Sequence, residues 1–193
     1  AEVAEVAEVA EVAAPVAFAD EDDVAPAEIP DRDPELVEIF LEEAGEIVES
    51  AAASLDAWMA APENLIEVQK LQRDLHTLKG GARMAEMPAL GDLAHELENL
   101  YEGRNTNTLQ ARPALFGLLN RYHDRIAEMV EDIRAKGWCK GGRSLIAQIH
   151  LAREAPSEAY LALVYAAAAI KQRVGPQATS LIDAQIEELK RAM

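Results

Sequence analysis

The sequence predicts an all-α protein whose central part is an antiparallel four-helix bundle. Apolar residues recur at helical spacing in four successive stretches between residues 34 and 137, and prolines and glycines separate these stretches. No segment alternates convincingly between apolar and polar residues as a strand would. Half of the 193 residues are hydrophobic, so a sizeable core is available, and the short connections favour antiparallel neighbours.

The first 33 residues differ from the rest of the chain. They contain an Ala/Glu/Val repeat of three residues, three prolines, and eleven acidic residues against one basic residue, Arg32. A period of three matches neither a helix nor a strand, so no stable apolar face forms, and the acids repel one another. We expect residues 1–33 to be a disordered acidic linker of the kind that joins modules of a longer polypeptide, with a frayed helix as the alternative.

The first two helices of the bundle are expected to begin at residues 34 and 62. Asp33 is an N-cap acid, and Pro34 follows it at the first helical position. The stripe of the first helix, which runs to about residue 60, consists of Leu36, Ile39, Phe40, Ile47, Ala51, Leu55 and Trp58. Pro62 opens the second helix, whose inward residues are Leu65, Val68, Leu71, Leu75 and Leu78.

Similar signals mark the third and fourth helices. Pro88 opens the third, and we expect Gly103 to end it. The fourth begins near residue 111, with Pro113 in its first turn, and stops near Gly137. Inward residues of these two helices are Leu90, Leu93, Ala94, Leu97 and Tyr101, then Leu115, Leu118, Leu119, Tyr122, Ile126, Met129 and Ile133.

Three more helical patterns follow, at about 143–154, 157–174 and 177–192, with breaks at Pro156 and at Gly175-Pro176. The middle pattern is apolar nearly all round and too short to span a bilayer, so it needs burial against the bundle or in an oligomer. We therefore divide the chain into the linker, a bundle domain at 34–139, and an additional helical segment of unknown role at 140–193.

The stretch RDLHTLKGGA, residues 73 to 82, carries the candidate chemistry. His76 and Lys79 share a helix face at i and i+3, and Gly80 follows at i+4. His76 is one residue past the inward Leu75, about 100° around the helix, so it should stand at the rim or the surface. Each glycine inside the helix costs about 1 kcal/mol relative to alanine. Gly80, however, leaves a bare surface where another protein's backbone could approach.

The third helix contributes LAHELENL, residues 93 to 100, in which His95 and Glu98 share a face. A carboxylate packed across from His76 would accept its Nδ1–H and leave Nε2 as a nucleophile. Spacing alone leaves other interpretations of His76 open. One is an incidental surface histidine. Another is a metal site formed by His76, His95 and Glu98, although a di-iron bundle needs Glu-x-x-His on paired helices, and this chain has His-x-x-Glu once.

HTLKGGA followed by LAHELENL resembles the histidine phosphotransfer (HPt) domain, in particular the phosphoacceptor domain of CheA-like chemotaxis kinases. The resemblance covers about residues 34 to 137 and implies an HPt-like four-helix bundle with His76 as the phosphoacceptor. It further implies that Glu98 orients the imidazole, that Lys79 balances phosphate charge, and that His95 joins the hydrogen-bond network. The linker suggests a multi-module relative, such as the kinases of type IV pilus (twitching motility) systems.

The resemblance also implies two partners. A histidine kinase ATP-binding domain, in cis or in trans, would phosphorylate His76, and a response-regulator receiver domain would take the phosphoryl group onto its aspartate. Docking of the receiver is expected at Gly80, Arg73 and Arg83. ATP and Mg²⁺ would belong to these partners, and we expect no cofactor in this chain, which shows no glycine-rich nucleotide loop.

Composition limits the other function classes. A net charge of −17 argues against nucleic acid and anionic membranes as partners. Cys139 is the only cysteine, and neither a long apolar run nor a signal peptide is visible, so we expect a cytoplasmic location. A helical docking or scaffold module that works without phosphorylation remains the alternative function. His123 and His150 lack the lysine–glycine context and are expected to be structural.

Overall fold

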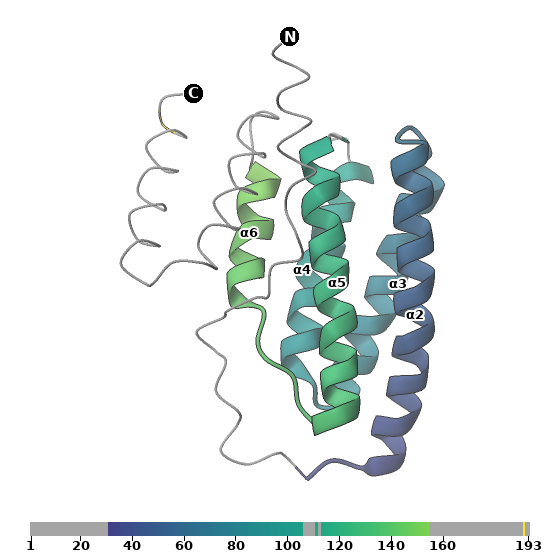
Figure 1. The fold of residues 1–193 in the computed structure, drawn as a ribbon, viewed down its shortest axis with the longest axis vertical. Helices are drawn as coiled ribbons and strands as arrows, with labels where there is room; N and C mark the ends of the chain where they lie inside the picture. Colours follow the sequence, from purple (N-terminus) through teal and green to yellow (C-terminus); the bar gives the residue numbers. More distant parts are fainter. Residues whose placement is uncertain (1–30, 106–110, 112, 155–190, 192–193) are drawn as a thin grey trace.

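The computed structural model describes residues 31–105, 111, 113–154 and 191. Residues 1–30 of the linker expected at 1–33, and all but residue 191 of the helices expected beyond residue 154, lie outside this range. The last residues of the expected linker are ordered, because Arg32 and Asp33 make hydrogen bonds to the bundle. The described part contains a bundle of four long helices with a shorter one beside it (Figure 1), which confirms the predicted all-α bundle. The helices are α2 (Pro34–Ala60), α3 (Leu65–Met84), α4 (Pro88–Asn105), α5 (Pro113–Lys136) and α6 (Arg143–Glu154).

Side-chain caps decide where α2 and α3 begin. The Asp33 carboxylate accepts hydrogen bonds from the backbone N–H groups of Glu35 and Leu36, so α2 begins at Pro34 as predicted. The prediction for α3 is wrong by three residues, because the helix begins at Leu65 rather than at Pro62. Asn64 is its N-cap, and the Asn64 side chain accepts a hydrogen bond of 3.1 Å from the Ile66 N–H. Pro62 lies in the turn before this cap.

Backbone conformation distinguishes Gly103 and Gly137, the two glycines expected to end α4 and α5. We expected Gly103 to end α4, but the helix continues to Asn105. A glycine ends a helix when it adopts the left-handed conformation, and among the described glycines only Gly137 has a positive φ, of 76°. Gly137 directly follows α5, so the predicted end of that helix is confirmed, and Pro113 is its first residue.

The core lies among α2, α3, α4 and α5, with the Trp58 ring packed edge-on against Tyr101 and Phe116. Two residues expected in the core are in fact exposed. Ile39 has 56% of its surface exposed because Phe40, one position further along α2, takes the inward direction. Leu65 is 36% exposed because it is the first residue of α3 and lies at the end of the bundle.

One arginine joins two helix ends that are far apart in the sequence. Glu86, just after α3, is the one described non-glycine residue with a positive φ, of 55°. Arg32 Nε donates to the carbonyl oxygen of Glu86 at 3.0 Å, and its Nη1 donates to that of Gly137 at 2.8 Å. The guanidinium therefore binds the carbonyls of both left-handed residues.

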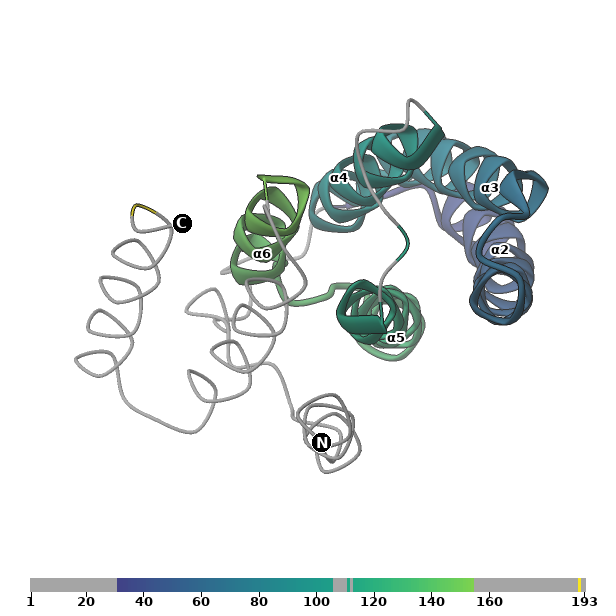
Figure 2. The same ribbon diagram turned by 90° about the horizontal axis from the view of Figure 1, so that it is seen from above.

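Helix α6 packs on the side of α4 that faces away from α3 (Figure 2). Leu145 and Ile149 of α6 are fully buried and belong to the same core cluster as the bundle. The bounds of α6 agree with the predicted helix at 143–154. The division of the chain at residue 139 stays a prediction. Within the described residues, no helix has the length and apolar character needed to cross a membrane.

Candidate functional site

Helix α3 presents His76 on its outer face. Leu75 and Leu78 on either side of it are buried, whereas the His76 side chain is 69% exposed. Helix α4 packs against α3 and brings Glu98 next to the imidazole, as expected from the sequence. The side chains of Glu98 and Lys79 are only 12% and 14% exposed, so the site consists of a partly buried ion pair below an accessible ring.

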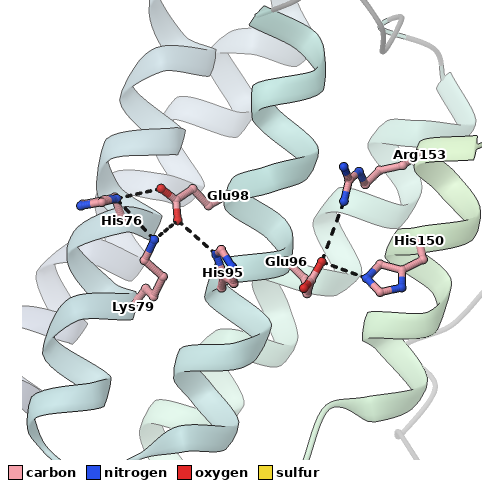
Figure 3. Close-up of polar contacts among 7 residues, drawn as sticks. All are labelled: His76, Lys79, His95, Glu96, Glu98, His150 and Arg153. Carbon is pink, nitrogen blue, oxygen red and sulfur yellow. Dashed lines mark hydrogen bonds and ion pairs between the residues drawn. The ribbon is translucent and has the colours of Figure 1, made fainter.

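Hydrogen bonds at the site fix which nitrogen of His76 is available (Figure 3). His76 Nδ1 lies 2.8 Å from Glu98 Oε1, and Lys79 Nζ donates to Glu98 Oε2 at 2.6 Å. A carboxylate can only accept, so Nδ1 must carry the proton and Nε2 then holds the lone pair. A protonated Nδ1 cannot accept from Lys79 Nζ, which lies 3.5 Å away, so the ammonium group is engaged by the carboxylate.

The Glu98 carboxyl remains ionised at neutral pH. Burial opposes its ionisation, but the hydrogen bonds from Lys79 and His76 and the positive charge of Lys79 outweigh burial and lower the pKa of Glu98. The carboxylate is therefore an acceptor under physiological conditions, which keeps the proton of the neutral His76 ring on Nδ1.

His95 lies near this network without being hydrogen-bonded to it. Its Nδ1 is 3.7 Å from Glu98 Oε2, beyond hydrogen-bond distance, and this buried nitrogen has no hydrogen-bond partner. The role expected for His95 stays a prediction.

The glycines around the site differ in what surrounds them. A Cβ built on Gly80 would meet nothing within 4 Å, so the surface next to His76 is open. A Cβ on Gly81 would lie 3.0 Å from Cδ2 of the buried Phe40, which shows that α2 packs directly on this residue. Gly91 of α4 lies against Ala82 and the Lys79 carbonyl, where it permits the close approach of α3 and α4. Gly91 is not predictable as a packing residue, because nothing in the sequence marks which helix faces it.

Arg73 and Arg83 are both exposed on α3, one on each side of His76 in the sequence. The stem of Arg83 runs past Gly91, with its Cγ 3.4 Å from a Cβ built there. Met84, which is not among the predicted site residues, is 69% exposed and follows His76 and Gly80 at steps of four residues. This spacing, which places the three residues on one helix face, was the available signal.

The two remaining histidines also contact α4. His123 Nε2 lies 2.8 Å from the Tyr101 hydroxyl, and desolvation of the ring lowers the pKa of His123 to about 4. His150 on α6 is more exposed, and its Nε2 lies 2.9 Å from Glu96 Oε2. Neither ring contacts Glu98 or Lys79.

The metal alternative requires three ligands arranged around one point. No group of three or more histidine, cysteine, aspartate or glutamate side chains in the described ranges has such an arrangement. At the candidate site itself, Glu98 Oε2 already accepts from the Lys79 ammonium group.

Comparison with known families agrees with this geometry. The model of the Hpt domain family matches residues 35–136. The chain belongs to the Hpt family. It is 34% identical over 103 residues to the chemotaxis protein CheA of Treponema pallidum (strain Nichols), a match that spans 53% of this chain and 13% of that protein. The chain therefore corresponds to a small part of the length of this relative.

Two solved structures have the same fold as the Hpt domain described here. One is the phosphorylated P1 domain of CheA3 in complex with CheY6 from R. sphaeroides, with a TM-score of 0.58 and 21% identity over 64% of this chain and 98% of that chain. Another is the histidine phosphotransfer domain of CheA, with a TM-score of 0.56 and 24% identity over 60% of this chain and 90% of that chain. The predicted link to type IV pilus systems has no support among these relatives, which are all CheA proteins.

Proposed function

We propose that His76 is the phosphoacceptor of this Hpt domain and that Nε2 is the attacking atom. The observation that carries the proposal is the 2.8 Å contact between His76 Nδ1 and Glu98 Oε1 beneath a ring that is 69% exposed. This contact holds the proton on Nδ1, orients the ring and leaves the Nε2 lone pair directed away from the carboxylate.

In the first step, Nε2 attacks the γ-phosphorus of ATP held by the kinase domain of a CheA-type protein. The bond from phosphorus to the bridging oxygen breaks, and ADP leaves with the electron pair. The Nδ1 proton stays between the imidazole and Glu98, so the ring needs no separate base. Glu98 offsets the positive charge that develops on the ring, and Lys79 keeps the carboxylate ionised. A role for Lys79 in balancing the charge of the phosphoryl group belongs to the same proposal.

In the second step, an aspartate of a receiver domain attacks the phosphorus and the N–P bond breaks, which returns the lone pair to Nε2. The open surface at Gly80 and the exposed Met84 support docking of the receiver on this face of α3. Arg73 and Arg83, both exposed on the same helix, would contribute positive charge at the rim. The phosphorylated P1 domain of CheA3 is in complex with CheY6 in its solved structure, and we propose a partner of the same class here.

ATP and Mg²⁺ are supplied by the partner domains under this proposal, and the described Hpt domain contributes the nucleophile and the docking surface. Most of the catalysis then comes from the partners, and the Hpt surface mainly positions the ring. Because ATP is the phosphoryl donor, we place the reaction in the cytoplasm.

The test is phosphorylation of the full chain by a panel of CheA-type kinase domains with ATP, and by phosphorylated receivers in the reverse direction. We expect an acid-labile, base-stable label that mass spectrometry locates on His76. His76→Gln should abolish the label while changing the free energy of unfolding by no more than about 0.5 kcal/mol, because the side chain is at the surface.

A label located on His95, His123 or His150 would contradict the assignment. Binding of a receiver by both the parent and His76→Gln, with no label in either protein, would instead favour the docking module that works without phosphorylation.

A further inference from the structure

Helix α4 carries two carboxylates, Glu96 and Glu98, which make contacts on opposite sides of the helix. Glu96 and Glu98 are two residues apart, which is about 200° around a helix. Glu98 reaches α3, and Glu96 reaches α6, where its Oε2 lies 2.9 Å from His150 Nε2 and 4.0 Å from Arg153 Nη1 (Figure 3). The same turn of α4 is therefore held by charged contacts from both sides.

Apolar packing reinforces the contact with α6. Leu93 precedes Glu96 by three residues and lies on the same face of α4. It packs against Gly142, which directly precedes α6, and a Cβ added to Gly142 would be 3.5 Å from Leu93 Cδ2. Leu145 and Ile149 of α6 are fully buried and belong to the same core cluster as Leu93. Helix α6 thus packs on α4 through buried apolar side chains and through the Glu96–His150 pair.

The rotation of α4 about its own axis decides whether Glu98 reaches His76. The end of a side chain lies about 5–6 Å from the helix axis, so a rotation of about 10° moves it by about 1 Å. The His76–Glu98 contact is 2.8 Å long, and an extra 1 Å would take it out of hydrogen-bond range. A displacement of about 1 Å at a reacting group can cost up to about a hundredfold in rate.

We propose that Glu96 and His150 are positioning residues. Their contact sets the rotation of α4 about its axis and thereby holds Glu98 within hydrogen-bond distance of His76. This inference rests on the proposed function of His76. It gives α6, which lies outside the residues matched by the family model, a role in the phosphotransfer reaction. A merely structural ion pair at this position would add a little stability and leave the His76 ring unchanged.

The experiment uses the full chain with Glu96→Ala, His150→Ala and the conservative Glu96→Gln, whose amide oxygen can still accept from Nε2–H. Glu131→Ala is the matched control, because it removes an ion pair of 2.7 Å with Arg134 that does not involve α4. Nitrogen-15 NMR of the His76 ring reports the fraction of the Nδ1–H tautomer. Kinase assays with ATP separate the maximal rate of phosphorylation from the KM for the Hpt domain.

We expect Glu96→Ala and His150→Ala to lower the maximal rate by about 3- to 10-fold with KM within about twofold of the parent. Both should shift the His76 ring towards the Nε2–H tautomer, and Glu96→Gln should restore most of the parent tautomer and rate. If both alanine variants match Glu131→Ala in tautomer and rate, the proposal is wrong. If no kinase labels the parent, the proposed function fails, and the tautomer comparison alone still decides whether the Glu96–His150 pair positions Glu98.

Discussion

His76 and His123 both make a 2.8 Å contact with a side chain of α4, but their surroundings are opposite. His76 contacts the Glu98 carboxylate and has most of its ring in solvent. His123 contacts the neutral Tyr101 hydroxyl, and burial raises the pKa of that hydroxyl well above its usual value. The two histidines therefore have similar contact lengths and different chemical capacities.

Under the proposed function, the difference indicates that exposure of the ring and the charge of its partner, rather than the contact alone, suit His76 for group transfer. An ionised partner fixes the proton on Nδ1 of His76 and stabilises positive charge on the ring. Desolvation at His123 disfavours that charge and lowers the pKa of the ring to about 4. His123 therefore joins α5 to α4 through its contact with Tyr101, and the structural role expected for it stays a prediction.

The largest effect we expect from this comparison is on stability at low pH. The pKa of His123 falls from 6.5 in the unfolded chain to about 4 in the folded one, so between these values the unfolded state binds the additional proton. The free energy of unfolding should therefore decrease as the pH falls from 6.5 to 4, by about 3 kcal/mol from this residue. Urea unfolding at a series of pH values measures it. His123→Gln should flatten this part of the profile, and an unchanged profile in that variant would contradict the assignment.

Removing the α4 partner of each histidine, Glu98 or Tyr101, should separate effects on the phosphorylation rate from effects on the free energy of unfolding. Glu98→Ala removes the acceptor that fixes the His76 tautomer, and we expect phosphorylation by the kinase to slow by about 10- to 100-fold. Tyr101→Phe removes the hydroxyl next to His123, so the free energy of unfolding should fall by about 1 kcal/mol with the phosphorylation rate within about twofold of the parent. Kinase assays and urea unfolding of both variants provide the comparison. Equal rates in the two variants would refute the role given to Glu98.

The smallest effects concern the two adjacent glycines of α3. Gly80→Gln should raise the free energy of unfolding by up to about 1 kcal/mol, because glycine is a poor helix former and the site is open. Transfer to a receiver should nevertheless slow by about 5- to 10-fold, because the new side chain stands one turn from His76.

Gly81→Ala is the control for this variant. Its Cβ would press on the buried Phe40 at 3.0 Å, and we expect a net loss of about 1 kcal/mol in the free energy of unfolding with the transfer rate unchanged. Stopped-flow measurement of transfer and thermal unfolding test both expectations. If Gly80→Gln transfers as fast as the parent, the receiver docks elsewhere.

The sequence predicted the bundle well because each helix is long and amphipathic and has a clear start or stop signal. The errors in the helix bounds lie where two residues could each begin a helix, or where a helix-stop residue acts only in one backbone conformation. Pro62 and Asn64 could each begin α3, and the Asn64 side chain decides it by accepting from the Ile66 N–H. Gly103 carries a stop signal in the sequence, but a glycine stops a helix only when its φ becomes positive.

At the candidate site, too, the features within one helix could be predicted from the sequence, whereas the contacts of Glu96 and Gly91 with neighbouring helices could not. The spacing of His76, Lys79 and Gly80 within one helix could be read from the sequence, and so could the need for a carboxylate opposite the imidazole. The Glu96–His150 pair joins residues 54 positions apart, and no local pattern predicts such a contact. Gly91 was missed for the same reason, since its importance comes from the neighbouring helix.

The Arg32 guanidinium has a consequence for how this end of the molecule opens. It binds the carbonyls of Glu86 and Gly137, and it is followed directly by the Asp33 cap, so it links the start of α2 to the turns after α3 and α5. Helix ends usually fray separately, and their amides exchange with solvent through small local openings. Here the three segments share one side chain, so they should open together. Amide hydrogens around Glu86 and Gly137 should then exchange at a common, slow rate, and Arg32→Ala should let each of them exchange on its own.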